Sequence, residues 1–124
     1  MDTPKPTASE LAILNVLWDR GPGTVREIHA ECGGGYTTVL KMLQIMTEKG
    51  LVKRDESDRA HIYRPALERK VTQNQLVGDL LDRVFGGSAS QLVLRALSEH
   101  KASKKEIAEI RKMLDRMEKH GGKK

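Results

Sequence analysis

The sequence predicts a mainly α-helical fold with one small β hairpin, and three observations support this prediction. Apolar residues recur at helical spacing in six segments along the chain. Hydroxyl residues followed three positions later by glutamate mark the starts of three of these segments as helix capping boxes. One short stretch near the middle of the chain alternates between polar and apolar residues, as a half-buried strand does.

Composition limits the size of the core and the location of the protein. The chain has 124 residues, about the length of one domain, and 38% of them are hydrophobic. No apolar run is long enough to span a membrane, and the first residues lack the apolar segment of a secretion signal. We therefore expect a cytoplasmic protein that does not insert into a membrane. The core must be aliphatic and small, since there are only four aromatic residues, Trp18, Tyr36, Tyr63 and Phe85.

Charge and cysteine content indicate the class of partner. The net charge of +5 favours an anionic partner such as nucleic acid. Residues 1–70 carry a net charge of +1 and residues 71–124 a net charge of +4, so charge alone does not locate a nucleic-acid surface. The single cysteine, Cys32, cannot form an intrachain disulfide or a thiolate metal cluster, and we expect it to be a small filler residue.

Two capping boxes predict the first two helices. Thr7 and Glu10 have the spacing at which the hydroxyl accepts from a first-turn N–H and the carboxylate reaches back to the cap residue. The helix that begins there presents a wide apolar face and ends at a turn rich in glycine and proline. Thr24 and Glu27 repeat the spacing, which predicts a short helix over Val25–Cys32.

Three glycines, residues 33–35, connect this helix to a third one. They lack the Gly-Lys-Ser/Thr ending of a phosphate-binding loop and no parallel strand precedes them, so we interpret them as a turn between helices. From Thr37 to Lys49 the side opposite the apolar residues is polar and has no acidic residue before Glu48. The apolar residues form one narrow stripe that we expect to face the core, namely Val39, Met42, Leu43 and Met46.

A β hairpin with a charged tip follows the third helix. Two short segments, residues 51–54 and 60–64, flank a polar turn at residues 55–59. Ile62 gives the second segment the alternation of a half-buried strand, and Pro65 closes it.

Three helices followed by a two-stranded ribbon, within about sixty residues, is the order of elements in a winged helix-turn-helix domain. The runs Tyr36–Leu43 and Thr47–Val52 resemble the recognition-helix segment of the penicillinase-repressor family, the transcriptional repressors of inducible β-lactamase systems. We therefore predict a winged helix-turn-helix DNA-binding domain over residues 7–66 and an α-helical dimerisation domain over residues 70–120. The resemblance covers nearly the whole chain, since it continues in residues 10–18, 86–87, 92–94 and 106–114.

The candidate DNA-binding residues lie on the outward face of the third helix and on the hairpin. A helix or a two-stranded ribbon fits the major groove of B-DNA and can present polar groups to base edges. In the family that this chain resembles, the start of the recognition helix enters the groove, and Thr38 matches its most recurrent threonine. The hairpin residues suit phosphate contacts, with charge pairing across the hairpin as the alternative. The residues predicted to contact DNA are Tyr36, Thr37, Thr38, Lys41, Gln44, Arg54, Arg59, Tyr63 and Arg64.

Three further amphipathic helices are predicted after the hairpin, and Ser103 with Glu106 forms a third capping box. These helices are too short for a free coiled coil, so they either fold back on the preceding domain or pair with a second copy. We favour a homodimer, because DNA-reading helices are commonly placed on two half-sites by a two-fold axis. The residues predicted at the dimer interface are Leu76, Leu80, Leu81, Val84, Leu92, Val93, Leu97, Ile107, Ile110, Leu114 and Met117.

The resemblance also implies a route of release. In the family, a membrane sensor with a cytoplasmic metalloprotease domain triggers a cut in the C-terminal domain, which weakens the dimer. The bond that aligns with the family's scissile position joins Arg95 to Ala96, and the familiar Asn-Phe pair is absent there. Cleavage would separate the last helix from the dimer, and a monomer contacts about half of the phosphates.

Metal-binding and catalytic sites are not expected. His29 and Cys32 could supply two ligands from one short helix, but two ligands do not make a site, and the other histidines are scattered. The C-terminal cysteine cluster of copper-responsive repressors, a second branch of the family, is absent. No nucleophile elbow or carboxylate pair is recognisable. We therefore predict a homodimeric transcriptional repressor that binds a pseudo-palindromic operator without a cofactor, with a winged-helix protein-interaction module as the alternative.

Overall fold

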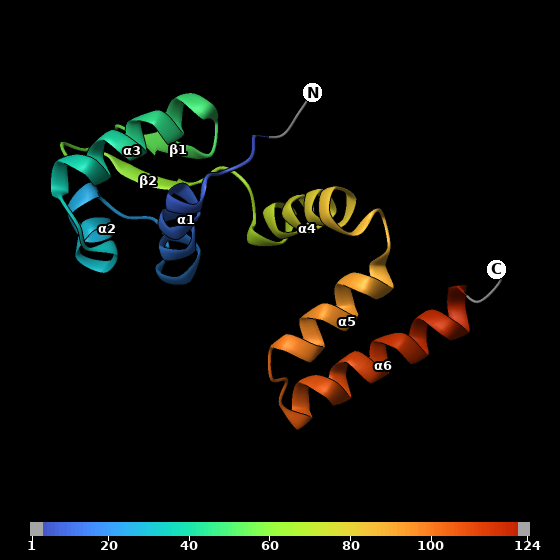
Figure 1. The fold of residues 1–124 in the computed structure, drawn as a ribbon. Coiled ribbons are helices and arrows are strands. Elements are labelled where there is room, and N and C mark those ends of the chain that lie inside the picture. The colour runs from blue at the N-terminus through green and yellow to red at the C-terminus, as the bar shows by residue number, and fades with distance from the viewer. Residues whose placement is uncertain (1–3, 122–124) are drawn as a thin grey trace. The chain divides into compact units, whose positions relative to one another are not determined.

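The structure, a computed structural model, describes residues 4–121, which form six helices and one two-stranded sheet (Figure 1). The predicted mainly helical fold with one hairpin is confirmed, and none of the helices in this part of the chain is long and apolar enough to cross a membrane. In chain order the elements are α1 (Ala8–Arg20), α2 (Val25–Cys32), α3 (Tyr36–Lys49), β1 (Val52–Asp55), β2 (Ile62–Pro65), α4 (Arg69–Phe85), α5 (Ala89–Glu99) and α6 (Lys104–Gly121).

The predicted capping boxes set the starts of three helices. At α1 the Thr7 hydroxyl accepts from the N–H of Glu10 at 3.2 Å, and the Glu10 carboxylate accepts from the N–H of Thr7 at 2.9 Å. The same pair of bonds opens α2 and α6. Each box pairs backbone donors that the first turn of a helix leaves without an intrahelical partner, and all three are therefore confirmed.

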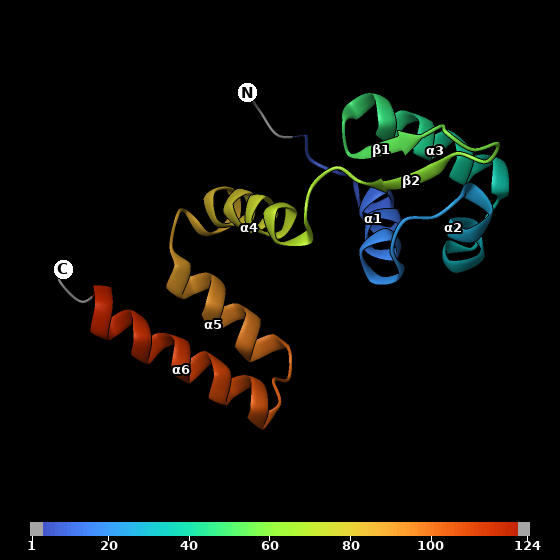
Figure 2. The ribbon, with the colours of Figure 1, turned by 180° about the vertical axis from the view of Figure 1, so that it is seen from behind.

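One aliphatic core lies among α1, α2, α3 and the hairpin. α1 contacts α2 and β2, while α3 contacts α2 and β1, and both views of the ribbon show α3 running along the hairpin (Figures 1 and 2). The hairpin and the residue before it contribute Leu51, Val52 and Tyr63 to this core. The helices contribute Ile13, Leu14, Leu17, Ile28, Val39, Leu43 and Met46.

The hairpin is antiparallel, and its bounds differ slightly from the predicted ones. Val52 lies opposite Pro65 and Asp55 opposite Ile62, so each strand ends one residue later than its pattern predicts. A backbone bridge adds a residue of the α1–α2 turn to the sheet. The N–H of Gly23 donates to the carbonyl of Tyr63 at 3.0 Å, and the N–H of Tyr63 donates back at 2.8 Å. This bridge fastens the hairpin to the start of α2.

α4 begins earlier than its apolar stripe predicts. The helix starts at Arg69, whereas the stripe starts at Leu76. The Arg69 guanidinium lies 5.4 Å from the centroid of the Trp18 ring and pairs with Asp19 at 2.5 Å. The indole N–H of Trp18 donates to the carbonyl of Leu67 at 3.1 Å. These tertiary contacts stabilise a polar helix start, which apolar periodicity does not register.

Contacts divide the chain into two compact units, with the division inside α4 after Asp79. The first unit holds α1 to α3, the hairpin and the first turns of α4. In the second unit α6 runs back from the turn after α5 in the opposite direction, as Figure 2 shows. Neither α5 nor α6 has a buried residue within the described part of the chain. The second unit therefore has almost no core of its own in a single chain.

Candidate nucleic-acid interface

α3 presents a polar face to solvent. Its inner face is fixed by Val39, Leu43 and Met46, each at most 4% exposed. Hydroxyl, ammonium and amide groups on the outer face are the groups that pair with base edges in a major groove. Ile45, which sequence reasoning missed, is also exposed there. The outer face brings together four of the predicted side chains, Thr37, Thr38, Lys41 and Gln44.

His29 holds the turn between α2 and α3. Its Nε2 lies 2.7 Å from the carbonyl oxygen of Gly34, and the imidazole donates because a carbonyl only accepts. The same ring meets the Tyr36 ring edge-on, with centroids 5.6 Å apart. Gly34 has a φ of +76°, which glycine adopts without strain. Tyr36 is exposed, as a DNA contact requires, and His29 holds it in place. The sequence suggests His29 only as a candidate metal ligand.

The β1–β2 hairpin, here termed the wing, carries arginines that differ in availability. Arg54 pairs with Glu56 at 2.6 Å. The hydrogen bond that the Arg54 guanidinium donates to Tyr63, followed by the one that it donates to Glu56, raises the pKa of Arg54 above its usual value. Arg59 and Arg64 are exposed, and within residues 4–121 the guanidinium of Arg59 makes no hydrogen bond or ion pair. Charge pairing in the wing therefore applies to Arg54, whereas Arg59 is available for a phosphate.

Tyr63 is not exposed on the wing, although the phosphate contact predicted for it requires exposure. Its side chain is 1% exposed and belongs to the core. Successive side chains of a strand point to opposite faces, and in β2 it is Tyr63 that turns inward. Its contribution to the interface is indirect, because it anchors the wing to Gly23 and bonds to the side chain of Arg54.

A cleft of about 380 Å³ lies between the start of α2, the start of α3 and the wing. Arg26, Arg59 and His61 line it, and none of the described lining residues is acidic. Sequence reasoning missed Arg26, because a lone arginine on an exposed helix face forms no motif and only the fold brings it beside the wing. The other lining residues are Thr24, Val25, Tyr36, Leu40, Ala60 and Tyr63.

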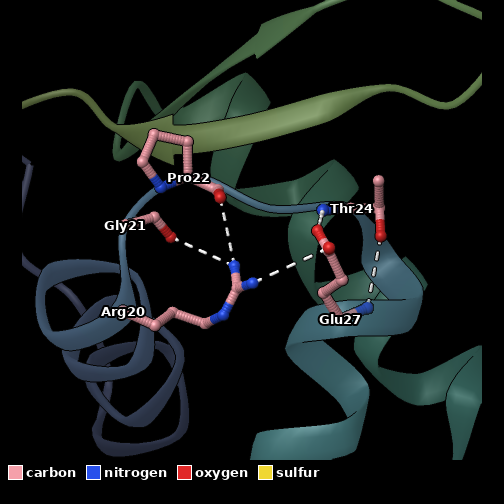
Figure 3. A network of polar contacts seen from close by, with 5 residues as sticks. All are labelled: Arg20, Gly21, Pro22, Thr24 and Glu27. Atoms are coloured by element: carbon pink, nitrogen blue, oxygen red, sulfur yellow. Dashed lines mark hydrogen bonds and ion pairs between the residues drawn. The ribbon is translucent and has the colours of Figure 1, made fainter.

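Arg20 fixes the turn that leads into this cleft. Figure 3 shows its guanidinium between the carbonyl oxygens of Gly21 and Pro22, at 3.3 and 3.1 Å, and the carboxylate of Glu27, at 3.7 Å. Glu27 also accepts from the backbone N–H of Thr24. That backbone bond, and after it the charge of Arg20, lowers the pKa of Glu27. Side chains from α1 and α2 thereby hold the start of α2 in place.

The predicted dimer residues lie on apolar faces that a single chain leaves open. Val84, Leu114 and Met117 are 64%, 58% and 57% exposed. Large apolar side chains exposed at helical spacing are typical of a surface that another chain covers. Leu80, Val93, Leu97 and Ile107 are exposed as well. Half-buried members of the predicted set are Leu76, Leu81, Leu92 and Ile110.

The bond aligned with the family's scissile position, between Arg95 and Ala96, lies in the middle of α5. Both residues line a second cleft, of about 290 Å³, together with Phe85 and Leu92. A peptide bond inside a helix becomes accessible to a protease when the helix unfolds locally. Since α5 has no buried residue, few contacts oppose that unfolding.

Residues 4–121 contain no group of three or more His, Cys, Asp and Glu side chains that could hold a metal ion. Cys32 is exposed at the end of α2, so the expectation that it is a filler residue is wrong. Partial burial, followed by the nearby charge of Glu31, raises the pKa of the Cys32 thiol. This shift favours the thiol over the thiolate, which is the nucleophilic form of cysteine.

Comparisons with known proteins agree with this geometry. A family model described as penicillinase repressor matches residues 6–116. The transcriptional regulator BlaI of Mycobacterium tuberculosis is 34% identical over 90 residues, covering 68% of this chain and 65% of the relative's own length. The penicillinase repressor of Bacillus licheniformis is 24% identical over 116 residues, covering 90% of this chain and 91% of the relative. A homodimeric winged helix-turn-helix DNA-binding domain from Mycobacterium bovis, solved by NMR, superposes with a TM-score of 0.50 at 30% identity, over 60% of this chain and 70% of that one.

Proposed function

Because the chain belongs to the penicillinase repressor family, a family of transcriptional repressors and not of enzymes, we propose that it represses transcription in the cytoplasm. It acts as a homodimer on a pseudo-palindromic operator in double-stranded DNA. Residues 7–66 form the DNA-binding domain and residues 70–120 the dimerisation domain, and no cofactor takes part.

The observation that carries this proposal is the exposed polar face of α3. Lysine can reach O6 and N7 of guanine, glutamine can pair with adenine, and threonine can contact the methyl group of thymine. Lys41 and Gln44 lie one turn apart on the exposed face, and Thr37 lies one turn before Lys41. A helix with this face can read several successive base pairs in one major groove.

The apolar faces of α4, α5 and α6 support the homodimer. A second copy of the chain covers Val84, Leu114 and Met117, which one chain alone leaves exposed. The related Mycobacterium bovis domain is described as homodimeric. Two copies also place two recognition helices on two half-sites, which matches the two-fold symmetry of a pseudo-palindrome.

Proteolysis of the C-terminal domain releases the operator in this proposal, as in β-lactamase regulation. A membrane sensor protease cuts between Arg95 and Ala96, and the dimer loses the apolar face of α6. Support comes from the position of the bond in a helix without buried residues. The intact mass of the chain after co-expression with a cognate sensor tests this step, and an uncut chain argues against it.

A salt titration of DNA binding tests the proposed function. Fluorescence anisotropy measures binding to fragments around the protein's own gene and to random DNA of equal length. We expect the specific fragment to bind at least about a thousandfold more tightly. Weak and equal binding of both DNAs by a folded dimer contradicts the proposal and favours the protein-interaction module.

Lys41→Ala tests the recognition face directly. Loss of a base contact should weaken operator binding by about 10- to 100-fold and leave the helical circular dichroism unchanged, because Lys41 is exposed. Lys112→Ala is the matched control, since it removes the same charge from the exposed surface of α6. Equal operator affinities for the two variants would remove Lys41 from the interface.

A further inference from the structure

We propose that the cleft between α2, the start of α3 and the wing seats one phosphate group of the DNA backbone, with Arg26 as a contact from α2. This inference rests on the proposed function, since operator DNA supplies the phosphate. It extends the interface from α3 and the wing to a third element. The ligand is the negatively charged oxygen of a phosphodiester. The cleft holds this group in place and supplies positive charge opposite it.

The cleft brings together donors from separate parts of the chain. Arg26 comes from α2, Arg59 and His61 from the wing, and Tyr36 from α3. The side chains of Arg26 and Arg59 are exposed, and within residues 4–121 neither guanidinium makes a hydrogen bond or an ion pair. A guanidinium offers a planar fork of donors that matches two phosphate oxygens. The volume of about 380 Å³ lies within the range of small-ligand sites, so it accommodates a phosphate with part of its sugar.

The charges around the cleft are arranged for an anion. None of its described lining residues carries a carboxylate. Of the acidic residues near it in the sequence, Glu27 pairs with Arg20 and Glu56 pairs with Arg54, while Asp58, next to Arg59, is exposed and does not line the cleft. The positive charge of Arg26 and Arg59 is therefore not neutralised by an ion pair within the described residues.

A phosphate in this cleft sets the register of the recognition helix. Phosphate contacts position a protein on the duplex without reading sequence, whereas base contacts specify the site. Tyr36 lines the cleft, and the exposed face of α3 begins at the next residue, Thr37. The backbone held at the cleft thus passes directly beside the first turn of the helix. The turn that carries Arg26 is itself held by the Arg20 network (Figure 3).

The salt dependence of DNA binding tests the contact. For wild type, Arg26→Gln and the matched control Arg116→Gln, affinity for operator and random DNA is measured from low to high salt. Arg116 is an exposed arginine on α6, so the control removes the same charge. We expect Arg26→Gln to weaken binding to both DNAs about tenfold per half-site and to reduce the salt slope of the dimer by about two units, one for each copy of the cleft, with the ratio between the DNAs unchanged. A salt slope and affinity equal to those of the control would overturn the inference.

Methylphosphonate substitution in the operator locates the phosphate. Replacing one charged phosphate at a time should weaken wild-type binding about tenfold at one position per half-site and leave Arg26→Gln unaffected at that position. Equal losses for both proteins at every position would overturn the inference. Failure of the proposed function looks different, because wild type would then bind operator and random DNA alike.

Discussion

At the scale of single residues, Glu10 links two helices. Its carboxylate is buried and accepts from the backbone N–H of Thr7 at 2.9 Å and from Nζ of Lys49 at 2.7 Å. Burial raises the pKa of Glu10, but the hydrogen bond from Lys49 and the bonds from Thr7 outweigh it, so the pKa lies below its usual value. The capping box was predictable from its spacing, whereas Lys49 lies 39 positions away and carries no local signal.

The lowered pKa of Glu10 gives a pH-dependent prediction. A carboxylate with a lowered folded-state pKa stabilises the fold above its unfolded pKa of about 4.3, and loses that contribution as the pH falls through the folded value. Lys49→Met should therefore reduce the free energy of unfolding by about 1–2 kcal/mol at pH 7 and by less at pH 3. Urea unfolding at both pH values measures this, with the exposed Lys53→Met as control. An equal loss at pH 7 and pH 3 would show that packing, and not charge, accounts for the effect.

At the scale of elements, the α1–α2 turn depends on a glycine. A Cβ at Gly23 would meet the guanidinium of Arg20, the group that bonds to the carbonyls of Gly21 and Pro22. The Arg20 side chain is flexible and can move away, so the substitution is tolerated sterically at the expense of those bonds. Gly23 also pairs its backbone with Tyr63, so the turn couples α1, α2 and the wing.

Gly23→Ala should therefore act through Arg20. We expect Gly23→Ala and Arg20→Ala each to lower the free energy of unfolding by about 1 kcal/mol, the net worth of one or two exposed hydrogen bonds. The double variant should lose no more than either single one, because both remove the same contacts. Thermal or urea unfolding of the three variants measures the coupling. Additive losses would show that Gly23 matters for another reason.

At the scale of the whole molecule, the features that could be predicted from the sequence are those set by residues close together in the chain. The capping boxes placed the starts of α1 and α2, and the apolar stripe of α3 placed its polar face outward. The inward position of Tyr63 was not predictable, because its neighbour Ile62 is also apolar and the alternation of so short a strand does not define which of the two turns inward. The meeting of Arg26 with Arg59 depends on tertiary packing, since 33 positions separate them and neither belongs to a motif.

Assembly of two chains gives the last prediction. In a dimer that covers the apolar face of α6, Leu114→Asp buries a charge without a partner, which costs about 3 kcal/mol or more. The dimer should then dissociate at least about a hundredfold more readily in analytical ultracentrifugation, and operator affinity should fall with it. Ala108→Asp introduces the same side chain on the polar side of α6, where it stays in water, and should leave the dimer intact. A Leu114→Asp dimer as tight as that of Ala108→Asp would place the interface on another surface, because a charge that remains hydrated costs almost nothing.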